Sequence, residues 1–230
     1  MKNFKKLFSL ILGICTLFTS IPNVFAGGTF SKPSSEKKSL NALVIGTNES
    51  QHKFLRIMLN ADASSLRIFK EFSDENYDIK FAISKDYKED PGIIITDIEK
   101  GFFISDRTEY KFKVILATVD ADQELEKVKE DMRNIVDFIC DYKRPFIQIL
   151  IVGCKESDKD IDFCKLSNFT GSVIESDGYK IGWGTNHDKN FSGTGQFLNF
   201  CPLYNSKKSN VVSHISRLSD KYDFYKKKTN

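Results

Sequence analysis

The sequence predicts an α/β fold: a three-layer sandwich whose central sheet is mostly parallel and includes one antiparallel hairpin. Three observations support this prediction. Short, continuously apolar runs typical of buried strands alternate along the chain with stretches that have apolar residues at helical spacing. The 230 residues include 40% apolar and 13% aromatic side chains, a composition typical of a globular domain rather than a disordered chain. One early pair of strand-like runs is separated by a short turn signal, which indicates the hairpin.

The first predicted unit is a strand, a turn and a helix. Residues 41–46 form an apolar run that ends in Gly46, as expected of a buried strand that leads into a turn. Residues 50–61 then carry apolar side chains at helical spacing. These are Phe54, Leu55, Met58 and Leu59.

The antiparallel hairpin is predicted next. Residues 78–83 alternate polar and apolar side chains, and Ile93-Ile94-Ile95 is a second apolar run. Between them lies Glu89-Asp90-Pro91-Gly92, a strong turn signal. We therefore expect residues 78–83 to pair with residues 93–95.

The second half of the chain continues the alternation of strands and helices. Strands are predicted at 112–119 and 146–153, and Arg144-Pro145 ends the helix between them. That helix has one continuous apolar face, formed by Leu125, Val128, Met132, Ile135 and Ile139. A last helix is predicted at 210–228. Ligands of such folds bind at the carboxyl ends of the strands, so the loops after these strands are the candidate sites.

The N-terminus has the pattern of an export signal. Lys2, Lys5 and Lys6 precede an apolar stretch, and Val24-Phe25-Ala26 precedes Gly27 as a small-residue cleavage pattern. The apolar stretch is shorter than the roughly 20 residues that a spanning helix needs, which favours a cleaved signal over a membrane anchor. Removal of those three lysines leaves 31 of the 34 basic residues against 31 acidic ones. The exported chain would be formally neutral, so its charge gives no support for a general nucleic-acid-binding surface, and we expect no nucleic-acid partner.

The predicted organisation is a signal peptide at 1–26, a flexible lead-in at 27–39 and a single α/β domain at 40–230. Within that domain, residues 167–200 are rich in glycine and contain the only tryptophan, Trp183, which indicates an irregular insertion. Signal cleavage would leave four cysteines. Their disulfide pairing stays open, because sequence separation alone does not establish disulfide geometry. They are Cys140, Cys154, Cys164 and Cys201.

The turn after Gly46 lies where a phosphate-binding loop would lie, with backbone amides at a helix start and Lys53 nearby. Its details differ from the pattern G-x-x-x-x-G-K-[ST]. Lys53 comes seven residues after Gly46 rather than six, His52 replaces the second glycine, and Phe54 replaces the hydroxyl residue that binds Mg²⁺. Taken alone, the segment is typical of an ordinary strand-to-helix turn. Asp120 and Asp122 similarly indicate a helix cap or a solvated turn.

The order of elements over most of the exported chain resembles the Ras-like and Rab-like small GTPases, a family of P-loop NTPases. The unit from Val114 to Asp158 looks like the family's fourth strand, third helix and fifth strand, with the base-recognition loop N-K-x-D at its end. Residues 204–211 look like the S-A-K loop that leads into the last helix. Asp97-Ile98-Glu99-Lys100-Gly101 resembles the D-x-x-G switch with one residue too many.

The resemblance implies a guanine-nucleotide site with Mg²⁺. Lys53 would contact phosphate beside Gly46, Asp97 would approach the metal, and Gly101 would present an amide to the terminal phosphate. Further site residues implied by the resemblance are Lys155, Asp158, Ser206 and Lys207.

Each of these motifs also departs from the family pattern. Cys154 replaces the asparagine of the base-recognition loop, Asp158 lies one position late, and the catalytic glutamine has no counterpart. A site with these changes would bind GTP or GDP weakly and hydrolyse GTP poorly, because phosphoryl transfer depends on fixed amides, metal and a positioned water.

Two functional hypotheses follow. The first is an exported, degenerate GTPase-like protein. It would either bind nucleotide weakly, with low hydrolase activity at most, or act as a pseudo-GTPase that binds a protein partner. The second is a secreted binding protein that uses the glycine-rich segment around Trp183.

Overall fold

A computed structural model describes residues 36–61, 68–105, 107–141, 147–157, 198–203 and 208–229. The α/β domain belongs to the unit Lys37–Asn230. Several predictions lie outside the described residues: the signal peptide, most of the lead-in, Trp183 and nearly all of the glycine-rich segment. The helix end at Arg144-Pro145 lies outside them as well.

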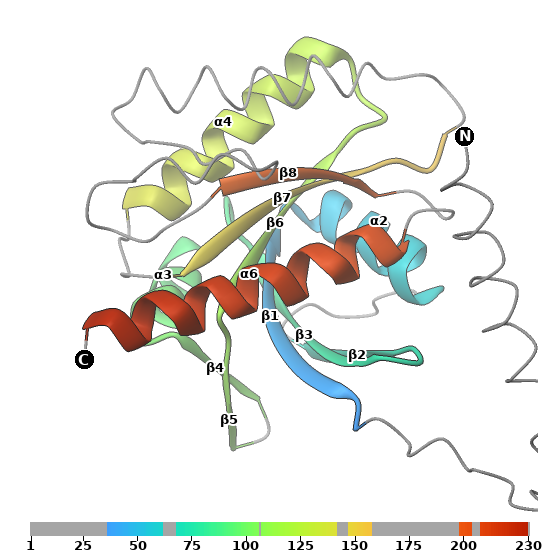
Figure 1. Cartoon of the computed structure of the whole chain (residues 1–230). Helices are drawn as coiled ribbons and strands as arrows, with labels where there is room; N and C mark the ends of the chain where they lie inside the picture. The colour runs from blue at the N-terminus through green and yellow to red at the C-terminus, as the bar shows by residue number, and fades with distance from the viewer. Residues whose placement is uncertain are drawn as a thin grey trace, which may run out of the picture. The chain divides into compact units, whose positions relative to one another are not determined.

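The domain alternates strands and helices in the predicted manner (Figure 1). In chain order the elements are β1 (Lys38–Gly46), α2 (Asn48–Leu59), β2 (Ile68–Ser73), β3 (Tyr77–Asp86), α3 (Pro91–Lys100), β4 (Phe102–Ser105), β5 (Thr108–Lys111), β6 (Val114–Asp120), α4 (Leu125–Asp141), β7 (Gln148–Cys154), β8 (Leu198–Leu203) and α6 (Lys208–Thr229).

The central sheet has six strands in the order β2-β3-β1-β6-β7-β8. Every neighbouring pair is parallel except β2 and β3, which are antiparallel. Helices α3 and α4 pack on one face of this sheet, and α2 and α6 pack on the other (Figure 1). The predicted fold class is thus confirmed: a three-layer α/β sandwich with a mostly parallel sheet and one antiparallel hairpin.

The predicted pairing of residues 78–83 with residues 93–95 was wrong. Strand β3 pairs with β2 and not with residues 93–95, which lie in α3. Pro91 occupies the first turn of that helix, where its missing amide hydrogen costs nothing, and Ile94 and Ile98 lie four residues apart on its buried face. The real hairpin turn is stabilised by Asp74, whose carboxylate accepts from the amides of Asn76 and Tyr77 at 2.8 Å each.

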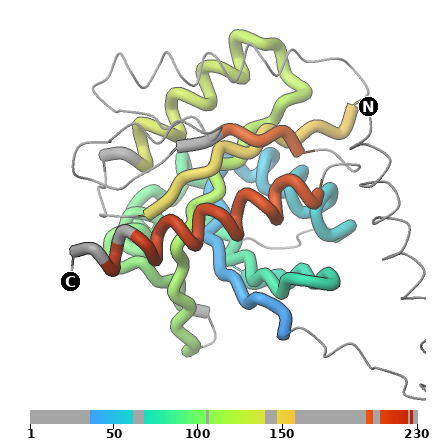
Figure 2. The backbone as a smooth tube through the Cα atoms, in the orientation of Figure 1, coloured from blue at the N-terminus to red at the C-terminus, as the bar shows by residue number. Residues whose placement is uncertain are grey.

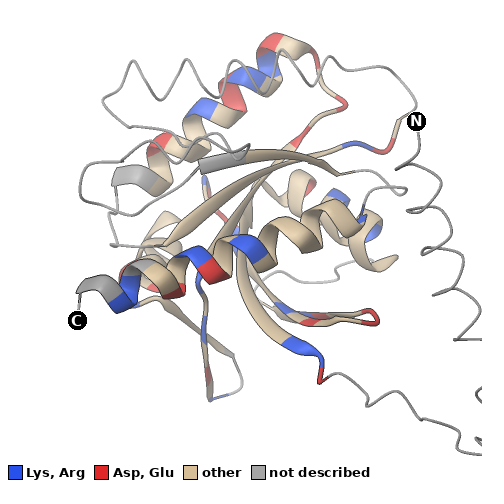
Figure 3. Ribbon diagram, viewed as in Figure 1, with Lys and Arg blue, Asp and Glu red and all other residues tan. Residues whose placement is uncertain are grey.

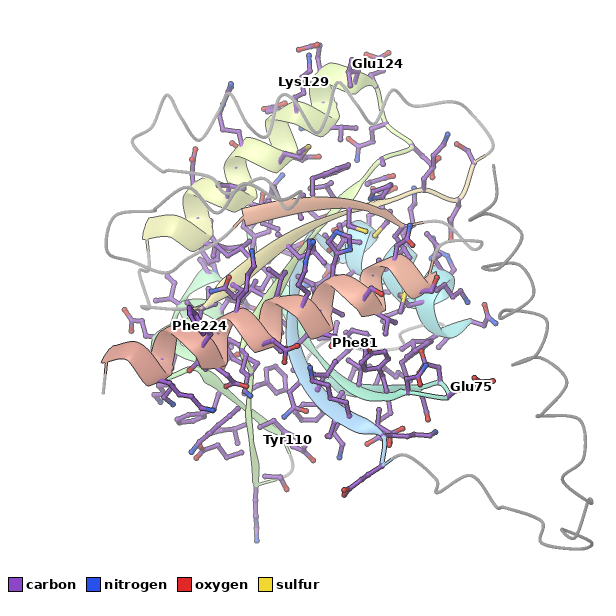
Figure 4. All side chains as sticks on the ribbon, in the orientation of Figure 1. Glu75, Phe81, Tyr110, Glu124, Lys129 and Phe224 are labelled. Atoms are coloured by element: carbon purple, nitrogen blue, oxygen red, sulfur yellow. The ribbon has the colours of Figure 1, made fainter. Side chains whose placement is uncertain are left out.

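The two faces of the sheet bury alternate side chains of the same strands. In β6, Leu116 packs toward α2 and α6, whereas Ile115 and Ala117 pack toward α3 and α4. On the α2 side, Phe54 meets Phe81 of β3 edge-on, with 5.3 Å between ring centroids; Figure 4 labels Phe81. Both faces are apolar, which explains why the central strands appear in the sequence as continuous apolar runs.

The surface of the domain is charged, as seen on α4. Lys127 pairs with Glu130, and Lys129 pairs with Glu126. Figure 3 shows basic and acidic residues alternating along α4. Glu124, just before this helix, and Lys129 are labelled in Figure 4. Such exposed pairs contribute little to stability, and they mark the solvent face of α4.

Two further features were not predicted. The short strands β4 and β5 form a separate antiparallel pair between α3 and β6. Strand β8 extends the main sheet beside β7, whereas the sequence indicated an irregular segment as far as Asn199. Cys154 and Cys201, on these two neighbouring strands, are both buried.

Candidate functional site

The candidate site is the edge of the sheet where the parallel strands end. Gly46 at the end of β1 lies beside Asp86 at the end of β3, and Asp120 at the end of β6 lies beside Cys154 at the end of β7. Ligands of open α/β sheets bind at this carboxyl edge. Its loops are therefore the ones to compare with the predicted nucleotide site.

The connection between β1 and α2 is a single residue, Thr47. Figure 2 traces the backbone of the domain with β1 in blue and α2 in lighter blue. The hydroxyl of Thr47 accepts from the amide of Ser50 and caps the helix, which begins at Asn48. A phosphate-binding loop needs several residues between strand and helix to wrap around phosphate oxygens. Here the helix starts at once, so the chain at this point is a tight strand-to-helix turn.

Gly46 has a packing role in this turn. A Cβ atom at this position would overlap the hydroxyls of Thr118 and Ser50, and it would lie 3.0 Å from the carbonyl oxygen of Thr118. Those two hydroxyls hydrogen-bond to each other at 3.0 Å, and Thr118 also donates to the carbonyl oxygen of Ile45. Glycine therefore allows β1 and α2 to approach β6 closely.

The amide at the start of α2 is occupied by a carboxylate of the same chain. Asp86, only 7% exposed, accepts from the amide of Asn48 at 2.7 Å with one oxygen and from the amide of Lys88 at 2.9 Å with the other. A helix N-terminus attracts an anion. In this protein the anion is the side chain of Asp86.

Lys53 of α2 is held between two acids. Its ammonium nitrogen lies 2.5 Å from a carboxylate oxygen of Asp120 and 2.9 Å from one of Asp122. Burial alone would lower the pKa of Lys53, but the hydrogen bonds and charges of the two aspartates outweigh it and leave the pKa raised. The lysine is thus a buried cation whose charge is neutralised within the protein.

Asp122 also holds the segment that follows β7. It accepts from the amides of Glu156 at 2.9 Å and Ser157 at 3.0 Å, and from the Ser157 hydroxyl. Burial would raise the pKa of Asp122, but these hydrogen bonds and Lys53 overcome that effect and hold it well below its usual range. The interpretation of Asp120 and Asp122 as a cap or solvated turn was therefore incomplete, because both carboxylates also bind a buried lysine.

Arg56, one turn after Lys53, reaches the same segment. Its guanidinium donates to both carboxylate oxygens of Glu156, from Nε at 2.7 Å and from Nη2 at 3.1 Å. This two-pronged hydrogen bond, together with the positive charge of Arg56, lowers the pKa of Glu156. Helix α2 thus makes two charged connections to residues 155–157, one direct and one through Asp122.

The structure brings together three of the predicted site residues. Gly46, Lys53 and Lys155 all lie at the carboxyl edge, and Lys155 is 5% exposed, with its amide bonded to the carbonyl oxygen of Leu203. The predicted Asp158, Ser206 and Lys207 lie outside the described residues.

Asp97 and Gly101 do not join this group. Asp97 is a buried residue of α3, and Gly101 ends that helix in the left-handed conformation with a φ of 71°. The carbonyl oxygen of Gly101 accepts from the amide of Phe112, just before β6 begins, so it lies at the opposite edge of the sheet. The acid that ends β3 is Asp86. The sequence pattern did not predict Asp86, because the misplaced hairpin put the end of this strand at residue 83. The position of Asp86 after an alternating run was the available signal.

The carboxyl edge does not fit Mg²⁺. Asp86 uses both carboxylate oxygens on backbone amides, and Asp120 and Asp122 bind Lys53. Among the described residues, no group of three histidine, cysteine, aspartate or glutamate side chains could hold a metal ion. The predicted metal ligand Asp97 lies in α3 and not among these acids.

In the described part of the chain no helix combines the length and the apolar character needed to cross a bilayer.

Comparison with known proteins gives structural similarity only. No protein-family model matches the sequence, and no curated protein matches it. Among solved structures, the chain is similar to a GTP-binding protein from the hyperthermophilic archaeon Sulfolobus solfataricus in complex with GDP, with a TM-score of 0.46 and 9% identity over 94% of this chain and 58% of that one. It is also similar to the mammalian SRP receptor, with a TM-score of 0.46 and 9% identity over 77% of this chain and 100% of that one.

A further match is the complex of SsGBP with GDP, with a TM-score of 0.44 and 12% identity over 96% of this chain and 56% of that one. The chain thus spans just over half the length of the first matched structures. With scores below 0.5 and identities near one in ten, these similarities carry no inference about activity.

Proposed function

We propose that this chain is an exported GTPase-like domain that does not depend on nucleotide and acts as a binding module for a protein partner. The observation that carries the proposal is the state of Lys53. The lysine that would contact phosphate is buried between Asp120 and Asp122, at 2.5 and 2.9 Å. Its charge is already neutralised within the protein.

Two further features support the same proposal. The carboxylate of Asp86 lies at the start of α2, where a phosphate oxygen would have to lie, and an incoming anion would be repelled by it. In the ion pairs that join α2 to the segments after β6 and β7, two cations face three carboxylates, so both positive charges are already balanced within the protein. They are Lys53 and Arg56 against Asp120, Asp122 and Glu156.

Hydrolysis of GTP would need more than binding. Phosphoryl transfer requires fixed amide donors, a metal ion and a positioned water. The first amide of α2 is taken by Asp86, and the acids at the edge are engaged with amides or with Lys53. The proposed role is therefore non-enzymatic.

The test is a titration of the purified chain with fluorescent mant-GTP and mant-GDP in the presence of Mg²⁺. We expect no saturable binding tighter than ~1 mM. Micromolar binding that is lost in Lys53→Ala, with the fold of the variant verified by circular dichroism, would overturn the proposal. Lys80→Ala, which removes an exposed ion pair with Glu71, is the matched control.

The partner-binding segment is a separate part of the proposal. The glycine-rich residues 167–200, with Trp183, are the candidate contact surface, on the grounds of composition. Deletion of residues 167–197, which spares β8, should abolish partner capture and leave the central sheet intact by circular dichroism. Unchanged capture would exclude the segment as the contact surface. Export is tested by N-terminal sequencing of secreted material, which should begin at Gly27.

A further inference from the structure

The charged contacts between α2 and the segment after β7 form one connected unit. It consists of Lys53, Arg56, Asp122 and Glu156, and we refer to it as the α2–β7 clamp. We propose that this clamp connects α2 to the segment after β7 in the way that a bound ligand would. It thereby keeps the carboxyl edge of the sheet in one conformation without nucleotide. The inference rests on the proposed function above.

The first half of the clamp runs through Asp122. One of its oxygens accepts from Lys53 at 2.9 Å and from the amide of Glu156 at 2.9 Å, and the other accepts from the amide and hydroxyl of Ser157. One carboxylate thus satisfies two consecutive backbone amides and a cation from α2. The position of residues 156–157 is therefore coupled to α2.

The second half runs directly from α2. Lys53 and Arg56 are three residues apart, so they project from the same side of the helix. Arg56 forms two hydrogen bonds with the carboxylate of Glu156, the residue whose amide is held by Asp122. Glu156 is thus held by its side chain and by its backbone, and both contacts lead back to α2.

The two halves differ in exposure. The side chains of Lys53 and Asp122 are 8% and 18% exposed, whereas those of Arg56 and Glu156 are 42% and 38% exposed. Water and salt weaken exposed ion pairs far more than buried ones. Asp122 should therefore contribute most to the clamp, and the Arg56–Glu156 pair should add a smaller, salt-sensitive contribution.

Hydrogen exchange of the Glu156 and Ser157 amides in the full chain tests the clamp. In Asp122→Asn the two amides lose a charged acceptor, and we expect them to exchange about tenfold faster or more. Glu156→Gln keeps both amides and weakens only the pair with Arg56, so a smaller acceleration is expected at low salt. Amides of β1 and β3, which exchange through global unfolding, should stay much slower than these two amides in both variants.

The matched control is Asp223→Asn, which removes an exposed ion pair with Lys113 and should leave all of these rates unchanged. The proposal is overturned if the two amides exchange at the wild-type rate in Asp122→Asn, or if they exchange only as slowly as those of β1 and β3, through global unfolding. Should Asp122→Asn fail to fold, Ser157→Ala removes the hydroxyl donor alone, and unchanged rates at both amides would count against the clamp. Slower exchange on addition of GDP to the wild type would overturn the proposed function instead.

Discussion

The ammonium nitrogen of Lys53 lies 2.5 Å from a carboxylate oxygen of Asp120, and both side chains are less than one-tenth exposed. This ion pair joins α2 to the end of β6. Lys53, which was predicted to contact phosphate, is here an internal cation paired with two carboxylates. The consequences of this and three other contacts can be measured.

Replacement of Lys53 by methionine should strongly destabilise the domain. The substitution leaves Asp120 and Asp122 buried side by side without their cation, and loss of one partner of a buried pair costs about 3–5 kcal/mol. Urea denaturation at pH 7 measures the change in the free energy of unfolding. The double variant Lys53→Met/Asp120→Asn should recover part of the loss; a fall of less than ~1 kcal/mol in the single variant would contradict the prediction.

Gly46→Ala should destabilise the domain by about 1–3 kcal/mol, because the added methyl group meets the hydroxyls of Thr118 and Ser50 in a packed site. Gly92 offers a control, since a Cβ there meets nothing within 4 Å. Gly92 lies in α3, and Gly92→Ala should raise stability by ~0.5–1 kcal/mol. Thermal denaturation should therefore move in opposite directions for the two variants. Equal shifts would argue against a packing role for Gly46.

Asp86→Ala should cost about 1–2 kcal/mol, because the amide of Asn48 at the start of α2 loses its acceptor. The matched control is Asp90→Ala. Asp90 precedes α3 but makes no capping hydrogen bond with its side chain, and its ion pair with Lys85 is exposed. Chemical denaturation should show a clearly larger loss for Asp86→Ala, and equal losses would show that Asp86 does not act as a cap.

The lowered pKa of Asp122 should make the free energy of unfolding depend on pH. The pKa of this carboxyl in the folded state is below its value in the unfolded chain, so the unfolded state binds more protons as pH falls below about 4. The stabilisation by Asp122 is therefore fully present above that pH and is lost progressively in acid. At pH 7 the wild type should exceed Asp122→Asn by ~2 kcal/mol. The difference should shrink as pH falls from 5 to 2, and a difference independent of pH would contradict the assignment.

Local patterns in the sequence predicted the regular elements well where packing agrees with periodicity. The apolar spacing of α4 and the continuous runs of β6 and β7 are direct consequences of burial on one or both faces. The prediction of the hairpin was wrong because the apolar run Ile93-Ile94-Ile95 is compatible with a strand and equally with the buried face of a helix. Pro91 and the spacing of Ile94 and Ile98 were the signals that favoured the helix.

The sequence predicted where the candidate site lies, at the carboxyl edge of the sheet. It did not predict which side chains contact one another there. The order of strands was sufficient to bring Gly46, Lys53 and Lys155 to the carboxyl edge. Asp86 was missed, because its place at the end of β3 depends on the correct hairpin. The meeting of Lys53 with Asp120, 67 residues away along the chain, depends on β1 lying beside β6.

The sequence by itself determined the α/β class, the main helices and the edge of the sheet where chemistry would be sought, because these depend on local periodicity and on chain direction. Only the tertiary structure decided what that edge contains. Charged groups pair with residues that are close in space but often distant along the chain. A buried charge needs such a partner, because burying it unpaired costs free energy. Lys53 therefore meets Asp120 and Asp122, and Asp86 caps α2, contacts that no local pattern in the sequence records.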